Sequence, residues 1–153
     1  MSIPAREPTI ASQPGASAIE AFEAGTLDPT AFDHEAHVHI AWSLLEQDEL
    51  PAATVRYSSA LRRLTRKWGV EEKYHETITV FFMALIAERR ADRPDAGWQD
   101  FMDSNRDLVE APRALLNNHY SGRRLQSELA RNQFLLPDRS PIGAPAGLGP
   151  SGG

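Results

Sequence analysis

Apolar residues recur every three or four positions along most of this chain, a spacing that predicts helices with one buried face. No segment alternates between apolar and polar residues as a half-buried strand would. Gly, Pro and Asp, which favour turns, separate the periodic segments. We therefore expect an all-α fold, a single compact helical bundle of about five to seven helices. The expected helices are 17–24, 34–48, 51–68, 71–91, 98–111, 113–118 and 121–131.

The segment 71–91 differs from the others because it is apolar nearly all round between Ile78 and Ala87. A helix that lacks a polar face is normally covered by its neighbours. We therefore expect 71–91 to be the central helix, with Glu71 and Glu72 in its first turn. Further on, 134–137 is expected to pack against the bundle as an extended strap.

The two ends of the chain differ in composition from the middle. Residues 1–15 are rich in Pro, Ser and Ala, and 143–153 consists mainly of Pro, Gly and Ala. Such segments cannot bury enough apolar surface to offset the entropy of folding. We expect them to be disordered tails on one helical domain, 16–142.

The composition of the chain excludes several classes of site and partner. The absence of cysteine excludes disulfides, thiolate metal sites and a cysteine nucleophile, and it is typical of a cytoplasmic protein. The net charge of -5 argues against nucleic-acid binding, which needs a basic surface. No signal peptide and no membrane-spanning segment is expected, so we predict no membrane partner. A small-molecule substrate is the expected partner, and a homo-oligomer is left open.

The histidines are the most informative polar residues. Of five, three lie within 34–39 and a fourth, His75, precedes the apolar segment 78–87. At about 100° per residue, His37 lies about 60° from His34, on the same stripe as Ala41. His39 lies about 140° from His34, toward solvent or the edge of that stripe. We therefore expect His34 and His37 to point inward and His39 to stand apart.

Three imidazoles on two helices are a pattern that can hold a divalent metal. His34 and His37 would supply two ligands and His75 the third, which leaves a coordination position open for water or substrate. Such a metal polarises a carbonyl or lowers the pKa of bound water. Imidazole suits zinc, copper and iron alike, so the metal is not specified. His119 is expected at a helix end, as a cap or surface residue.

Residues close to these histidines in the sequence are candidates for catalytic and substrate-binding roles. Glu76, with Glu35 as the alternative, is expected to be the acid/base residue or to orient a ligand histidine through a hydrogen bond. Tyr74, Thr79 and Tyr57 are expected to shape a substrate pocket. The leading hypothesis is a metal-dependent enzyme acting on a small molecule, with hydrolase, hydratase or lyase chemistry favoured over oxygenase chemistry.

Two alternatives remain open. In one, the protein is a non-catalytic helical protein, either a small-ligand binder or an accessory subunit, whose histidines are core residues that form hydrogen bonds. In the other, the region of His75 and Glu76 performs acid/base catalysis without a metal.

Several motifs resemble those of a family of small, largely uncharacterised bacterial all-α proteins. They are Phe32-Asp33-His34-Glu35-Ala36-His37 with Ala41-Trp42, Tyr74-His75-Glu76-Thr77-Ile78-Thr79, Tyr120-Ser121, and Pro137-Asp138-Arg139-Ser140-Pro141-Ile142. The resemblance covers about 32–142. It implies a shared helical fold and a shared histidine site, but no substrate.

Overall fold

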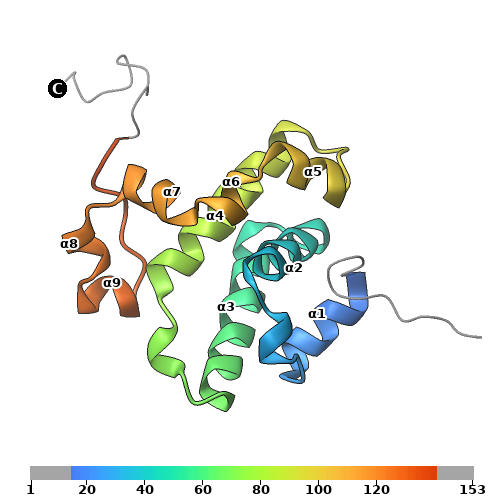
Figure 1. Cartoon of the computed structure of the whole chain (residues 1–153), viewed down its shortest axis with the longest axis horizontal. Helices are drawn as coiled ribbons and strands as arrows, with labels where there is room; N and C mark the ends of the chain where they lie inside the picture. The colour runs from blue at the N-terminus through green and yellow to red at the C-terminus, as the bar shows by residue number, and fades with distance from the viewer. Residues whose placement is uncertain (1–14, 141–153) are drawn as a thin grey trace, which may run out of the picture.

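Four helices carry most of the buried residues in this computed structural model, which describes residues 15–140 (Figure 1). They are α1 (Gly15–Ala24), α2 (His34–Gln47), α3 (Leu50–Lys67) and α4 (Glu76–Asp92). The shorter ones are α5 (Trp98–Ser104), α6 (Asp107–Glu110), α7 (Pro112–His119), α8 (Gly122–Leu125) and α9 (Glu128–Asn132). Two 3₁₀ turns, η1 (Pro29–Ala31) and η2 (Glu71–Lys73), complete the set.

The all-α prediction is confirmed, since residues 15–140 contain helices and no strand. The proposed tails, 1–15 and 143–153, fall almost wholly outside the described residues. No helix within residues 15–140 is long and hydrophobic enough to cross a lipid bilayer.

Local chemistry explains where the long helices begin and end. The Asp33 carboxylate accepts the backbone N–H of Ala36 at 2.9 Å and so caps α2. Pro51 lies in the first turn of α3, where its missing N–H costs nothing. Gly69 follows α3 with φ of +73°, a conformation that side chains disfavour. These boundaries agree closely with those that the sequence predicts.

The structure contains more helices than the five to seven expected, because two predicted helices are each divided. Helix 98–111 breaks after Ser104, where the Asn105 side chain donates to the Phe101 carbonyl at 2.8 Å. Helix 121–131 breaks before Glu128, where the Ser127 hydroxyl accepts the N–H of Ala130 and starts α9. Short polar side chains compete with the backbone for hydrogen bonds and create these ends.

The helix predicted over 71–91 begins later than expected. Its first residues form η2, the chain is extended at Tyr74, and His75 is the N-cap of α4. The prediction that this segment is the central helix is wrong. Instead α2 packs against α1, α3, α4 and α6, and nine of its 14 residues are buried. On α4, Ala84 is exposed, because a small apolar side chain loses little by facing water.

Polar contacts fasten α1 to the core of the bundle. The guanidinium of Arg56 on α3 pairs with Glu23 at 2.8 Å and with Asp48 at 2.9 Å. The Arg56 hydrogen bond lowers the pKa of the Glu23 carboxyl. Lys67 donates to the carbonyl of Gly25, just past the end of α1. Some basic residues of α3 therefore make contacts within the fold, although Arg62, Arg63, Arg66 and Lys67 remain exposed to solvent.

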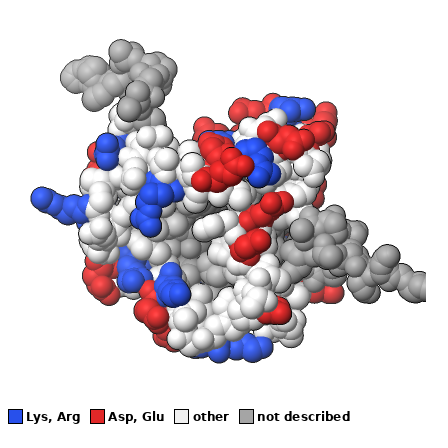
Figure 2. Space-filling model, in the orientation of Figure 1, with Lys and Arg blue, Asp and Glu red and all other residues white. Residues whose placement is uncertain are grey.

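The segment 134–137, predicted to pack as an extended strap, has no helix and is held to Thr77 and Tyr120 through the backbone of Leu135. The predicted packing is confirmed only in part, because Phe134, Leu136 and Pro137 are exposed. The Thr77 hydroxyl donates to the Ala130 carbonyl at 2.7 Å and accepts the Leu135 N–H at 3.1 Å. The Tyr120 hydroxyl donates to the Leu135 carbonyl at 2.7 Å. Two buried hydroxyls thus anchor the C-terminal segment. Figure 2 shows several basic side chains (blue) on the side of the molecule where Figure 1 places α7, α8 and α9.

Candidate functional site

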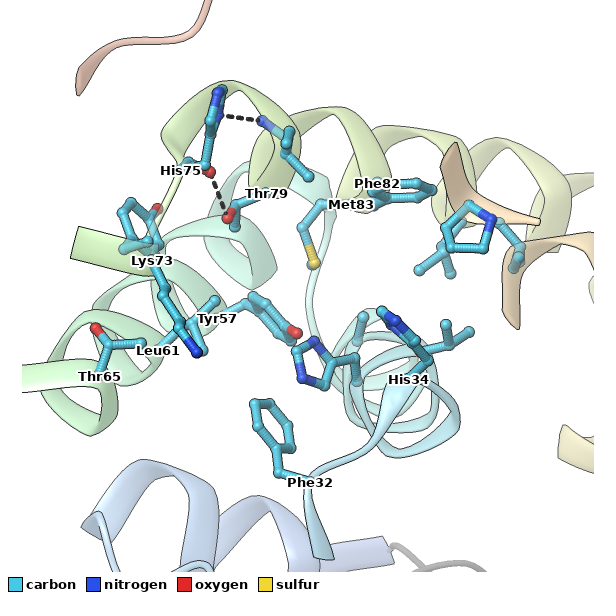
Figure 3. Close-up of a pocket in the computed structure, with 18 of the residues that line it drawn as sticks. Phe32, His34, Tyr57, Leu61, Thr65, Lys73, His75, Thr79, Phe82 and Met83 are labelled. Carbon is cyan, nitrogen blue, oxygen red and sulfur yellow. Dashed lines mark hydrogen bonds between the residues drawn. The ribbon is translucent and has the colours of Figure 1, made fainter. Parts of the chain in front are cut away.

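A cavity of about 950 Å³ lies between the first half of α2, the second half of α3 and the first half of α4 (Figure 3). The loop around η1 and the helices α6 and α7 contribute further lining residues, and the cavity is partly open to solvent. Most of the wall is apolar. It is formed by Pro29, Phe32, Val38, Ala41, Leu61, Trp68, Val70, Ile78, Phe82, Met83, Ile86, Leu108, Pro112 and Leu116.

A few polar side chains interrupt this wall. Tyr57 and Thr79, both predicted to shape a pocket, line the cavity. The Tyr57 side chain is buried, and its hydroxyl points into the cavity (Figure 3). Burial raises the pKa of Tyr57, so the phenol stays protonated at neutral pH. Thr79 is held by its own helix, because its hydroxyl donates to the His75 carbonyl at 2.8 Å.

His34 and His37 line the cavity together, as the helical wheel predicts, but His34 is exposed and not buried as expected. Their ring centroids are 6.0 Å apart. His34 is exposed at the rim, whereas the His37 ring stacks on Phe32 with centroids 3.8 Å apart. Burial, reinforced by the charge of His34, lowers the pKa of His37 to about 4. His37 is therefore a neutral imidazole at physiological pH.

His75 also lines the cavity, on the wall opposite His34 (Figure 3). Both of its ring nitrogens are occupied. Nδ1 accepts the N–H of Ile78 at 3.2 Å, and Nε2 donates to the carbonyl of Leu125 at 2.8 Å. These bonds define one neutral tautomer that caps α4 and ties it to α8. In this arrangement neither nitrogen is available to a metal ion.

The two carboxylates with expected catalytic roles lie outside the cavity lining. Glu76 Oε1 accepts from Arg62 at 2.8 Å and from the Tyr74 hydroxyl at 2.5 Å. The Arg62 guanidinium also covers the Tyr74 ring at 4.9 Å. Tyr74 lines the cavity with its ring, while its hydroxyl is turned to Glu76. Glu76 is thus part of an ion pair, and Glu35 is half-buried elsewhere on α2.

His39 stands apart from His34 and His37, as predicted, because it does not line the cavity. The prediction that it faces solvent is wrong. It is fully buried, and its ring stacks on Trp98 with centroids 3.7 Å apart. The helical wheel fails here because α2 is covered on nearly all sides, so the side facing away from His34 is also interior. His119 ends α7, half-buried beside Phe81, and does not line the cavity.

The three predicted ligands therefore share a cavity without forming a metal-binding group. Among residues 15–140, no three His, Asp or Glu side chains are grouped so that they could hold one metal ion. The three-His site remains a prediction that would need His75 to leave its present hydrogen bonds.

Lys73 lines the cavity beside Leu61 and Thr65 and was not predicted from the sequence (Figure 3). The available signal was its position directly before Tyr74 and His75. Phe32, Trp68 and Phe82 were also missed, because apolar cavity residues have the same spacing as core residues.

Comparisons of the chain with protein-family models, with curated proteins and with solved structures gave no match. The resemblance to a small bacterial family therefore stays an expectation.

Proposed function

We propose that this protein binds a small organic molecule with an apolar body in the cavity between α2, α3 and α4. The carrying observation is the volume of about 950 Å³, which is large for a chain of 153 residues. Ligand sites in proteins typically measure about 300–1,000 Å³ and combine apolar walls with a few fixed polar groups. Both properties are present here.

The polar groups favour binding over catalysis. His37 is neutral, Thr79 is bonded to its helix, and the Glu76 carboxylate is neutralised by Arg62. The Tyr57 hydroxyl can donate to a ligand, because its proton is retained at neutral pH. We find no carboxylate in the lining that could act as a general base. The alternative drawn from the sequence, a small-ligand-binding helical protein, is thus the better supported one.

A metal-dependent enzyme is the second candidate. One observation favours it, namely that His34, His37 and His75 all line the same cavity. A ligand that displaced the His75–Leu125 hydrogen bond would free one imidazole nitrogen. In either case we place the protein in the cytoplasm, as its lack of cysteine suggests.

The proposal is tested with a neutral, apolar fluorescent probe, N-phenyl-1-naphthylamine, titrated into the full-length protein. We expect saturable binding with a blue-shifted emission, because the probe leaves water. Leu61→Trp fills the cavity from α3 and should weaken binding at least tenfold. Val55→Trp is the matched control, since Val55 lies on the same helix but is 63% exposed and outside the lining.

Thermal melting followed by circular dichroism checks that both variants are folded. Saturable binding that Leu61→Trp reduces and Val55→Trp leaves intact supports the cavity as the site. Absence of saturable binding, or equal binding by both folded variants, contradicts the proposal.

A further inference from the structure

The charge of the cavity wall differs from that of the whole protein. The chain has 21 Asp and Glu against 16 Lys and Arg. None of the acidic residues lines the cavity, whereas Lys73 and Arg113 do. The lining histidine that is most buried, His37, is neutral. A net negative protein therefore has a cavity whose fixed charges are positive.

These two cations are not neutralised by a neighbour within the described part of the chain. Arg56, Arg62 and Arg89 each pair with a carboxylate at 2.6–2.9 Å. No such pair involves Lys73 or Arg113 among residues 15–140. Of the two lysines, Lys67 donates to a carbonyl of the fold, and Lys73 is the one at the cavity.

The position of Lys73 distinguishes it from Arg113. Lys73 belongs to η2, and its side chain runs along the cavity side of α3 so that the ammonium lies near Leu61 and Thr65 (Figure 3). Trp68 and Val70 line the cavity in the same region. Lys73 is exposed, so its ammonium lies where the cavity meets solvent, next to the apolar residues that line the cavity there. From this place it can attract an anionic head group while the apolar part of the same ligand lies against the wall. Arg113 stands on α7, on another side of the cavity.

We infer that the ligand is an amphipathic monoanion, such as a medium-chain or aromatic carboxylic acid, whose anionic head pairs with Lys73 and whose body lies against the apolar wall. This inference rests on the proposed function, because it specifies the chemical class of the same ligand. The Tyr57 hydroxyl, which points into the cavity, is an additional donor for the head or for a polar group near it.

The test compares two ligands that share a ten-carbon chain and differ in the head group, which is an anionic carboxylate in one and a neutral hydroxyl in the other. Decanoate and decanol, both at submicellar concentration, compete with bound N-phenyl-1-naphthylamine at pH 7.5 and 0.15 M salt. We expect decanoate to displace the probe at a concentration at least ten times lower than decanol requires. Lys73→Met should weaken decanoate about tenfold and leave decanol unchanged, since the methionine stem retains the apolar contact.

Two controls locate the charge. Arg113→Met removes the other cation of the lining, and Arg123→Met removes an exposed cation on α8 outside it. We expect Arg123→Met to change decanoate binding less than twofold, and Arg113→Met to weaken it less than Lys73→Met does. Equal weakening by Lys73→Met and Arg113→Met would show general attraction and overturn the assignment to Lys73.

The inference and the proposed function fail in different ways. If decanoate and decanol displace the probe equally well, the cavity is a binding site but the anionic class is wrong. If the neutral probe itself shows no saturable binding, the proposed function fails, and the inference fails with it.

Discussion

The imidazole of His39 lies flat against the indole of Trp98, with ring centroids 3.7 Å apart and the planes tilted by 9°. Neither ring nitrogen of His39 has a hydrogen-bond partner among the described residues. Stacking on the indole is favourable for the two faces of a neutral imidazole. It offers no hydrogen bond to the ring N–H and does not stabilise a charged ring. Burial accordingly lowers the pKa of His39 to about 4.

This stack predicts that the protein loses stability in mild acid. The unfolded chain has a histidine pKa of about 6.5, so it binds the proton more readily than the folded state does. The contribution of His39 is therefore fully present above about pH 6.5 and is lost as the pH falls toward 4. We expect a decrease on the order of 3 kcal/mol in the free energy of unfolding.

Urea denaturation between pH 4 and 7.5 measures this effect. His39→Phe keeps a flat ring against Trp98 and removes the titrating group, so the variant should lose less stability than wild type over this range. His37, whose pKa is also lowered to about 4, contributes in the same direction and remains present in both proteins. Identical pH profiles for the two proteins would refute the assignment to His39.

Thr77 is predicted to be the residue on which the C-terminal segment depends most. Its fully buried hydroxyl contacts the Ala130 and Gln133 carbonyls and the Leu135 N–H. Thr77→Val has nearly the same volume but leaves these backbone groups unpaired, which should cost about 1–3 kcal/mol. Thr77→Ser keeps the hydroxyl and is the matched control.

Hydrogen exchange locates that effect. In Thr77→Val we expect faster exchange over 129–138, with little change in α2. Uniformly faster exchange, or equal destabilisation by the serine variant, would mean that the methyl group and not the hydroxyl holds the segment.

His75 is predicted to act as a helix cap. His75→Ala removes the acceptor for the Ile78 N–H and the donor to Leu125, and it should lower stability by about 1–2 kcal/mol. His75→Asn can still cap α4 but does not reach Leu125, so it should recover part of the loss. Thermal melts of the three proteins measure this order, and an alanine variant as stable as wild type would contradict the capping role.

The second candidate function predicts bound metal. Elemental analysis by plasma mass spectrometry on tag-free protein should then find near-stoichiometric zinc, copper or iron, and His34→Ala should lose it. His39→Phe should retain it, because His39 is stacked away from the cavity. No metal after reconstitution with all three ions would leave ligand binding without a metal as the function.

The sequence by itself determined the helical fold and most helix boundaries. These depend on interactions within a few residues, such as the Asp33 cap and the φ of Gly69, which a periodic pattern reveals. It also determined that His34 and His37 share one side of α2, because helical geometry fixes that relation without reference to the rest of the chain.

Only the tertiary structure decided what those side chains meet. His39 is buried because other helices cover α2 on the side away from His34. His75 is occupied because Leu125, 50 residues later in the chain, lies against it. Glu76 is neutralised by Arg62, and the cavity exists because α2, α3 and α4 do not fill the space between them. Such contacts join residues far apart in sequence, and no local pattern records them.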